Sequence, residues 1–171
     1  GKISAISNGA GAYALPNPPA NLAFDFVGIS SVAVRWQPGD NREPVVYQVS
    51  LASGASSPFL ASPALNFTFT GLTPNTILPF SGLARNPELP ASSQLAFLAS
   101  TVTLAEPPTG EGFPEVFRSS ATARWSRGAN PPETEFLVEL STSIERVPVF
   151  TTSGWIRAAE FTFTSLPPQA Y

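Results

Sequence analysis

The sequence predicts an all-β protein built from two antiparallel β-sandwiches in series. The main observation is a repeat. Val32–Trp36 (VAVRW) recurs 89 residues later as Ala121–Trp125 (ATARW), and Pro18-Pro19 recurs at the same spacing as Pro107-Pro108. A fixed long period indicates tandem copies of one supersecondary unit. The second observation is composition, because 19 prolines and 12 glycines among many Val, Phe, Thr and Ser residues are typical of short strands separated by turns.

Alternating patterns locate the strands and their buried faces. Residues 32–36 and 47–51 alternate in the first copy, and residues 136–140 alternate in the second. The segment 67–74, which begins with a further strand, returns at 161–168 with a spacing of 94 rather than 89, so the second copy has five extra residues before this point. The residues expected to face inward are Val32, Val34, Trp36, Tyr47, Val49, Leu51, Phe67, Phe69, Phe136, Val138 and Leu140.

The residue types that the chain lacks restrict its chemistry. It has no Cys and no His, which removes the thiolate and imidazole groups that serve as nucleophiles, bases and zinc or copper ligands. The 12 acidic residues are mostly spaced as on a solvated face, so we expect no catalytic pair, enzyme activity, metal or cofactor. The net charge of −3 with nine scattered basic residues argues against a nucleic-acid partner, and the apolar runs are too short to span a membrane.

At these positions the sequence resembles fibronectin type III repeats. Such repeats begin with a Pro-Pro-x-x-Leu segment, here Pro18–Leu22, and have a Trp late in strand B and an aromatic residue in strand C. A Leu-x-Pro then precedes a corner tyrosine, which Leu78 replaces in the first copy and which Tyr171 supplies one residue early in the second. The resemblance implies seven-stranded sandwiches with the core residues Trp36, Tyr47, Leu72, Trp125, Phe136 and Leu166.

The resemblance divides the chain into three parts. Residues 19–106 are expected to form a complete sandwich, and residues 107–171 a second one that lacks its own strands F and G. Residues 1–18 read as a donor of these two strands, with Asn8-Gly9 as the hairpin turn between them. The order of the parts is therefore that of a circular permutation of two whole domains.

The donor strands are expected to come from a neighbouring subunit or from the next unit of one long chain. The two ends of such a domain lie at opposite poles, so two domains in series would separate residue 18 from residue 171 by on the order of 50 Å. We expect the donor to pair near residues 161–164 or 136–140, and head-to-tail joints that do not close generate a filament. The expected joint residues are Ile3, Ala5, Tyr13, Leu15 and Tyr171.

These features predict the structural repeat unit of an extracellular filament or cell-surface stalk, whose partners are copies of itself. The leading alternative is a spacer or carbohydrate-binding appendage of a secreted enzyme, and another is a fragment of an adhesin or receptor. A further alternative is that the sequence is an arbitrary window of a long tandem polypeptide, in which residues 1–18 would be a linker, because a Gly- and Ala-rich start is typical of linkers.

Two surface residues bear on these alternatives. Trp155 lies in the surplus of the second copy without a counterpart in the first, and it is either a platform for sugar stacking or, as we favour, a cover for the sheet edge. Asn66-Phe-Thr68 is the chain's single N-glycosylation sequon, so Asn66 is a candidate glycan site in a secreted protein.

Overall fold

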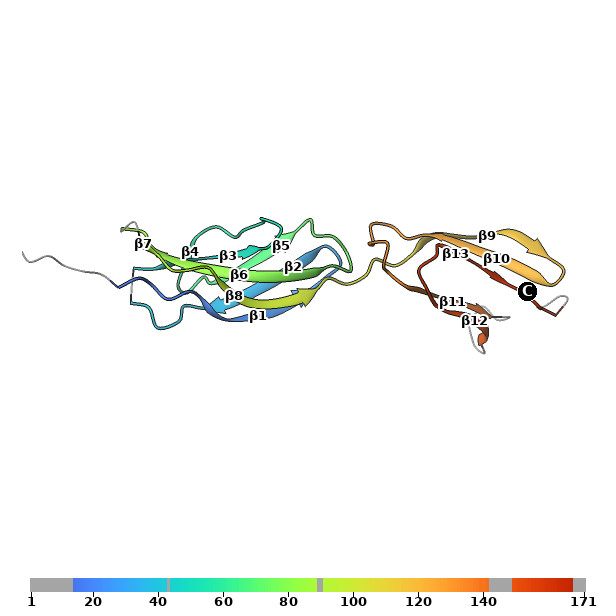
Figure 1. Ribbon diagram of the computed structural model, residues 1–171, viewed down its shortest axis with the longest axis horizontal. Helices are drawn as coiled ribbons and strands as arrows, with labels where there is room; N and C mark the ends of the chain where they lie inside the picture. Colours follow the sequence, from blue (N-terminus) through green and yellow to red (C-terminus); the bar gives the residue numbers. More distant parts are fainter. Residues whose placement is uncertain (1–13, 43, 89–90, 142–148, 168–171) are drawn as a thin grey trace, which may run out of the picture. The chain divides into compact units, whose positions relative to one another are not determined.

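The computed structural model describes residues 14–42, 44–88, 91–141 and 149–167 (Figure 1). All regular elements in these ranges are β-strands, and they form antiparallel sheets. Strands β1–β8 make one pair of sheets and strands β9–β13 make another. The predicted all-β class is therefore confirmed, and the expected boundary after residue 106 falls in the segment between β8 and β9.

The first sandwich has a three-stranded sheet and a five-stranded sheet. The smaller sheet has the order β1 (Ala20–Val27), β2 (Ser31–Gln37), β5 (Asn66–Thr70). The larger sheet has the order β4 (Leu60–Ala61), β3 (Val46–Leu51), β6 (Ile77–Asn86), β7 (Ala91–Ser92), and β8 (Ala96–Val102) also pairs with β6. β3 is thus an interior strand with partners on both edges.

Alternation buries one face of each central strand of the first sandwich. β2 and β3 bury every second residue, as the sequence pattern predicts. On β5, Phe69 is buried and Phe67 is half-buried. The buried residues of β2 and β3 are Val32, Val34, Trp36, Tyr47, Val49 and Leu51.

β6 closes the first sandwich on the side opposite β4. Its Phe80 is fully buried, and the ring lies 5.6 Å from the ring of Phe24 on β1, which joins the two sheets across the core. Gly82 lies beneath Pro19 and Leu98, because a Cβ built on Gly82 would be 2.5 Å from Cγ of Pro19 and 2.8 Å from Cδ1 of Leu98. Only a very small residue at this position of β6 allows that close approach.

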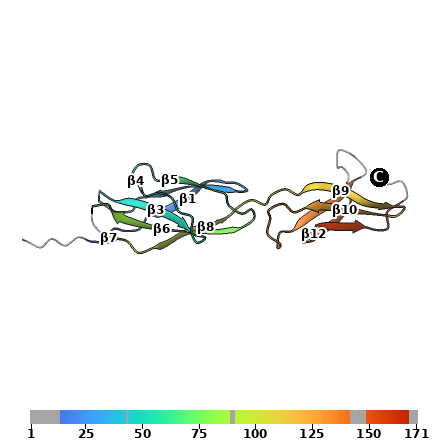
Figure 2. The same ribbon diagram turned by 90° about the horizontal axis from the view of Figure 1, so that it is seen from above.

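The second sandwich has a three-stranded sheet and a two-stranded sheet. The first has the order β9 (Thr109–Phe117), β10 (Ser120–Ser126), β13 (Glu160–Phe163), and the second pairs β11 (Phe136–Ser141) with β12 (Val149–Ile156). Figure 1 shows the sheets as two layers, and Figure 2 shows β9 beside β10. Within the described ranges β11 has a strand partner on one edge, whereas β3 of the first sandwich lies between β4 and β6.

The core of the second sandwich joins β10 and β13 to β11. The rings of Trp125 on β10 and Phe136 on β11 meet edge to face, with centroids 6.0 Å apart, and Val138 and Ile156 pack against the same cluster. Leu72 of the first sandwich is half-buried, whereas the other residues expected in the two cores are buried, namely Trp36, Tyr47, Trp125, Phe136 and Leu166.

One asparagine in each copy ties the loop after β2 or β10 to the segment that precedes the sandwich. Oδ1 of Asn41 accepts a hydrogen bond from the amide of Asn17 at 2.7 Å, and Nδ2 donates to the carbonyl of Asn17 at 2.8 Å. Asn130 makes the same two bonds with Glu106 at 2.9 and 2.8 Å. Both pairs are 24 residues apart, and each residue recurs at the 89-residue spacing. The repeat therefore extends from the strands to the loops.

Replacing these asparagines is expected to destabilise each sandwich separately. Asn130→Ala should lower the free energy of unfolding of the second sandwich by about 1–3 kcal/mol, because it removes the partners of the Glu106 backbone, and Asn41→Ala should do the same in the first. Urea titration followed by fluorescence measures both. The control is Asn66→Ala at an exposed position, with an expected change below about 0.5 kcal/mol. An equal loss of unfolding free energy in all three variants would contradict the stabilising role of the Asn41 and Asn130 hydrogen bonds.

Candidate functional site: an open groove in the second sandwich

The second sandwich contains an open groove between its two sheets, with a volume of about 700 Å³. One wall is formed by β9 and β10 and the other by β11, and the lining includes Trp125, Phe136 and Leu140 from the core. Phe113 of β9 also lines the groove. The groove therefore offers an apolar floor and the edge of a strand.

The first sandwich has a strand at the equivalent place. There β6 pairs with β3 over six residue pairs, from Val46 opposite Arg85 to Leu51 opposite Phe80. Residues 136–140 of β11 lie 89 positions after residues 47–51 of β3 and match their pattern, so the edge of β11 that corresponds to the β3–β6 ladder faces the groove. The groove of the second sandwich therefore lies where β6 lies in the first sandwich.

β9 differs from β1 in exposure although its backbone is similar. Asn21 of β1 and Gly110 of β9, 89 positions apart, both have positive φ angles, 50° and 64°. Phe24 packs on Phe80, but Phe113, its equivalent on β9, is 56% exposed, and all nine residues of β9 are exposed. β1 and β9 differ in exposure because Phe80 of β6 packs on Phe24, whereas Phe113 has no such covering residue in the described part of the chain. The exposed large apolar residues that line the groove are Phe113, Leu137 and Val149. Exposed apolar residues that gather in a groove are typical of an interaction site.

Trp155 lies on β12, directly opposite Leu137 of β11, and is 68% exposed. The amide of Val49 donates to Oγ of Ser57, and the amide of Val138 donates to Oγ of Ser153, at 3.0 Å in both copies. This shared contact gives the sequence alignment between the segment that leads into β4 and the equivalent segment of β12.

The alignment gives Trp155 a counterpart in the first copy. Ser57 and Ser153 are 96 positions apart, so Trp155 corresponds to Phe59. The expectation that Trp155 has no counterpart is therefore wrong. The extra residues of the second copy precede Ser153, so Trp155 lies after them, and between Ser153 and β13 the second copy has two fewer residues than the first has between Ser57 and β5. In the first sandwich, Arg85 of β6 lies over the Phe59 ring, 4.0 Å from its centroid. A β6 side chain therefore covers the aromatic residue at this position.

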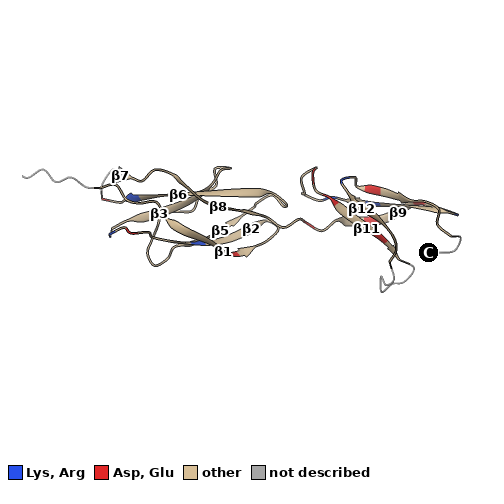
Figure 3. Cartoon of the chain, turned by 60° about the horizontal axis from the view of Figure 1, so that its bottom comes forward, with Lys and Arg blue, Asp and Glu red and all other residues tan. Residues whose placement is uncertain are grey.

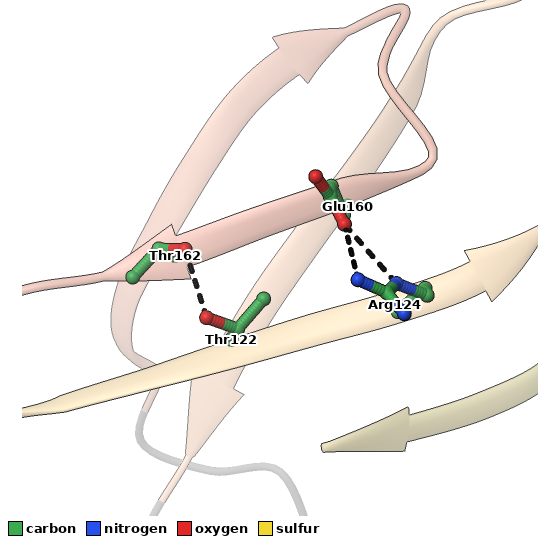
Figure 4. A network of polar contacts seen from close by, with 4 residues as sticks. All are labelled: Thr122, Arg124, Glu160 and Thr162. Carbon is green, nitrogen blue, oxygen red and sulfur yellow. Dashed lines mark hydrogen bonds and ion pairs between the residues drawn. The ribbon is translucent and has the colours of Figure 1, made fainter. Parts of the chain in front are cut away.

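The outer face of β10 and β13 is polar. The hydroxyls of Thr122 and Thr162 lie 2.9 Å apart, and Arg124 and Glu160 form an ion pair at 2.9 Å. Figure 4 shows both contacts. The ion pair is largely exposed and contributes little to stability. In the first sandwich β5, the equivalent of β13, is an edge strand, and β6 pairs with β3 instead. This comparison favours β11 over β13 as the partner of an added strand.

Charged groups at the groove are few. Glu111 of β9 and Glu139 of β11 line it together with Arg124, and Figure 3 shows acidic positions on these two strands among mostly uncharged residues. In the part of the chain that the structure describes, no group of three or more acidic residues gathers to form a metal site. The groove therefore offers apolar contacts and backbone hydrogen bonds.

The other predicted site residues fall in two groups. Asn66 is exposed at the start of β5, and Leu15 is exposed ahead of β1. Ile3, Ala5, Tyr13 and Tyr171 lie outside the described residues. No helix among the described residues has the length and apolar character needed to cross a membrane.

The sheet orders of the two units define a pair of fibronectin type III-like sandwiches. A segment of two fibronectin type III domains from chicken tenascin aligns with a TM-score of 0.54 and 17% identity, over 89% of this chain and 85% of that chain. The domain from human fibronectin type III domain containing protein 3 aligns with a TM-score of 0.42 and 19% identity, over 57% of this chain and 94% of that chain. No family model and no curated protein matches the sequence. The tenascin alignment confirms the predicted resemblance at the level of the fold.

Proposed function

We propose that this chain is the structural repeat unit of an extracellular filament or surface stalk, joined head to tail by β-strand complementation. The observation that supports the proposal is the groove, where an apolar floor lies beside a strand edge of β11. A strand added there forms a ladder of backbone hydrogen bonds with β11 and places alternate side chains on the floor. Filling the groove also covers a surface that otherwise favours uncontrolled association.

Residues 1–15 of another copy are the proposed donor. Residues 10–19 correspond to residues 99–108 at the 89-residue spacing, so Leu15 matches Leu104, which follows the end of β8. The end of the N-terminal segment thus has the sequence position that strand G of a preceding unit would have. Separate subunits and successive units of one long polypeptide both provide this donor.

The remaining features fit a structural role, and the sequon bears on a location outside the cell. The chain contains no Cys or His, and 12% of its residues are charged. Asn66, in the single sequon, is exposed and so accessible to glycosylation. We propose that the filament is non-enzymatic and holds no cofactor.

The experiment compares the full chain with a variant that lacks residues 1–15. The full chain should assemble end to end into filaments visible by negative-stain electron microscopy. The shortened variant should form no filaments and should unfold or aggregate irregularly through its second sandwich, because its groove stays open. A synthetic peptide of residues 1–15 should bind the shortened variant in a 1:1 complex and raise its unfolding temperature, because a ligand that binds only the folded state stabilises it. As matched controls, Ile3→Asp/Ala5→Asp should prevent assembly and Lys2→Ala/Ser4→Ala should permit it.

Two results would contradict the proposal. Filaments of the shortened variant that equal those of the full chain would show that residues 1–15 are not the donor. A full chain that remains monomeric at all concentrations and binds oligosaccharides, with binding lost in Trp155→Ala, would favour the alternative of a carbohydrate-binding appendage. That alternative rests on the exposed indole of Trp155.

A further inference from the structure

We infer that the donor strand docks on β11 in one register, in which Ile3, Ala5 and Ser7 face the core and Ser4 lies directly opposite Glu139. The inference rests on the proposed function and adds the residue-by-residue partner of β11. It follows from the β3–β6 ladder of the first sandwich, used as the template for the joint.

The template requires a specific order of side-chain sizes. The inward residues of β6 that pair with β3 are Phe80, Gly82 and Ala84, all buried. The middle one must be small because Pro19 and Leu98 approach its backbone. Pro108 is the equivalent of Pro19 at the 89-residue spacing, and it lines the groove. A strand that enters the groove therefore needs a large apolar residue, then two small ones, at every second position.

Only one phase of the donor segment has this order. Ile3, Ala5 and Ser7 present a large apolar residue followed by two small ones. The opposite phase presents either Lys2, Ser4 and Ile6 or Ile6, Asn8 and Ala10. The first set buries a charge without a partner on the apolar floor, and the second places Asn8 beneath Pro108, where only a very small residue fits. Moving the strand by two residues would place Ile3 beneath Pro108, where the template tolerates no large side chain. The Asn8-Gly9 turn then follows the pairing region, as the end of β6 at Asn86 does in the first sandwich.

The outward residues of this register also match the surface of β11. Tyr47, Val49 and Leu51 of β3 pair with Ala84, Gly82 and Phe80, so the equivalent pairs at the joint are Phe136 with Ser7, Val138 with Ala5 and Leu140 with Ile3. Ile6 then lies opposite Leu137, whose other neighbour is Trp155. Lys2 lies diagonal to Glu139, within reach of an opposite charge on the same face.

Engineered disulfides test the register because the natural chain has no cysteine. Directly opposed Cα atoms in an antiparallel pair lie about 4.5–5.5 Å apart, which is within disulfide range. Residues two positions away are about 6.8 Å further along the strand and fall outside that range. Full chains with Ser4→Cys/Glu139→Cys, Lys2→Cys/Glu139→Cys and Ile6→Cys/Glu139→Cys are assembled, oxidised and separated by non-reducing electrophoresis.

The expected result is a ladder of covalent multimers for Ser4→Cys/Glu139→Cys, with at least tenfold less multimer for the other two variants. A ladder for the Lys2→Cys or Ile6→Cys variant instead would overturn the register while leaving strand complementation in place. If none of the three forms a ladder and electron microscopy still shows filaments of each, docking next to β11 is wrong. If none of the three assembles although Ser4→Ala/Glu139→Ala does, the proposed close approach of residues 4 and 139 is overturned. Two cysteines are together no larger than Ser4 and Glu139, so the proposed register would accommodate them.

Discussion

Trp125→Ala is expected to lower the free energy of unfolding of the second sandwich by roughly 3–5 kcal/mol. Trp125 is 7% exposed and meets the ring of Phe136 across the core. Its indole nitrogen has no hydrogen-bond partner in the described part of the chain, so its contribution is apolar packing. Because small domains have total stabilities of about 5–15 kcal/mol, a loss of this size removes a large fraction of the stability of the second sandwich.

Trp36→Ala, at 5% exposure, should have an effect of the same size on the first sandwich only. Urea titration followed by circular dichroism should then show one shifted and one unshifted transition in each variant. The control is Trp155→Ala, which removes the same side chain from an exposed position and should change stability by less than about 0.5 kcal/mol. A Trp155→Ala loss as large as that of Trp125→Ala would contradict the assignment of Trp125 to the core.

Phe80→Ala is expected to destabilise the first sandwich by about 3–5 kcal/mol. Phe80 is fully buried on β6 and contacts Phe24 on the facing sheet, so its removal leaves a cavity between the sheets. The first sandwich would then have a gap where the second has its groove.

Phe113→Ala is the comparison for Phe80→Ala. Phe113 of β9 is the equivalent of Phe24, the residue of β1 whose ring Phe80 contacts. In the unassembled chain this substitution should change stability by less than about 0.5 kcal/mol, since the ring is exposed. In assembled filaments it should weaken the joint, measured as a higher critical concentration for assembly. Equal effects of Phe80→Ala and Phe113→Ala on the unassembled chain would show that β9 is already covered.

Much of the fold was predictable because strand alternation is a local signal. The inward residues of β2 and β3, such as Val32 and Val49, are buried as the period of two requires. The expectation that residues 107–171 lack strands F and G implied an open apolar cleft, but the strands that line it, β9, β10 and β11, were not predictable, because they depend on which strand edges meet in space. The asparagine contacts were missed for a similar reason: Asn41 and Asn130 bond to backbone groups 24 residues away, and no periodicity marks such a pair. The equivalence of Phe59 and Trp155 was hidden because the extra residues precede Ser153.

The hydrogen bonds between Asn41 and Asn17 have a mechanical consequence for a filament joined as proposed. Tension on the donor strand would reach its own sandwich two residues after Leu15, at a backbone held by both its amide and its carbonyl. The pull would therefore pass into the loop after β2 before it could peel β1 from the sheet edge. At the other end of the joint, force directed along the donor strand would load the hydrogen bonds with β11 in shear, all at once rather than one after another. Each subunit would transmit force from one end to the other without opening its own core.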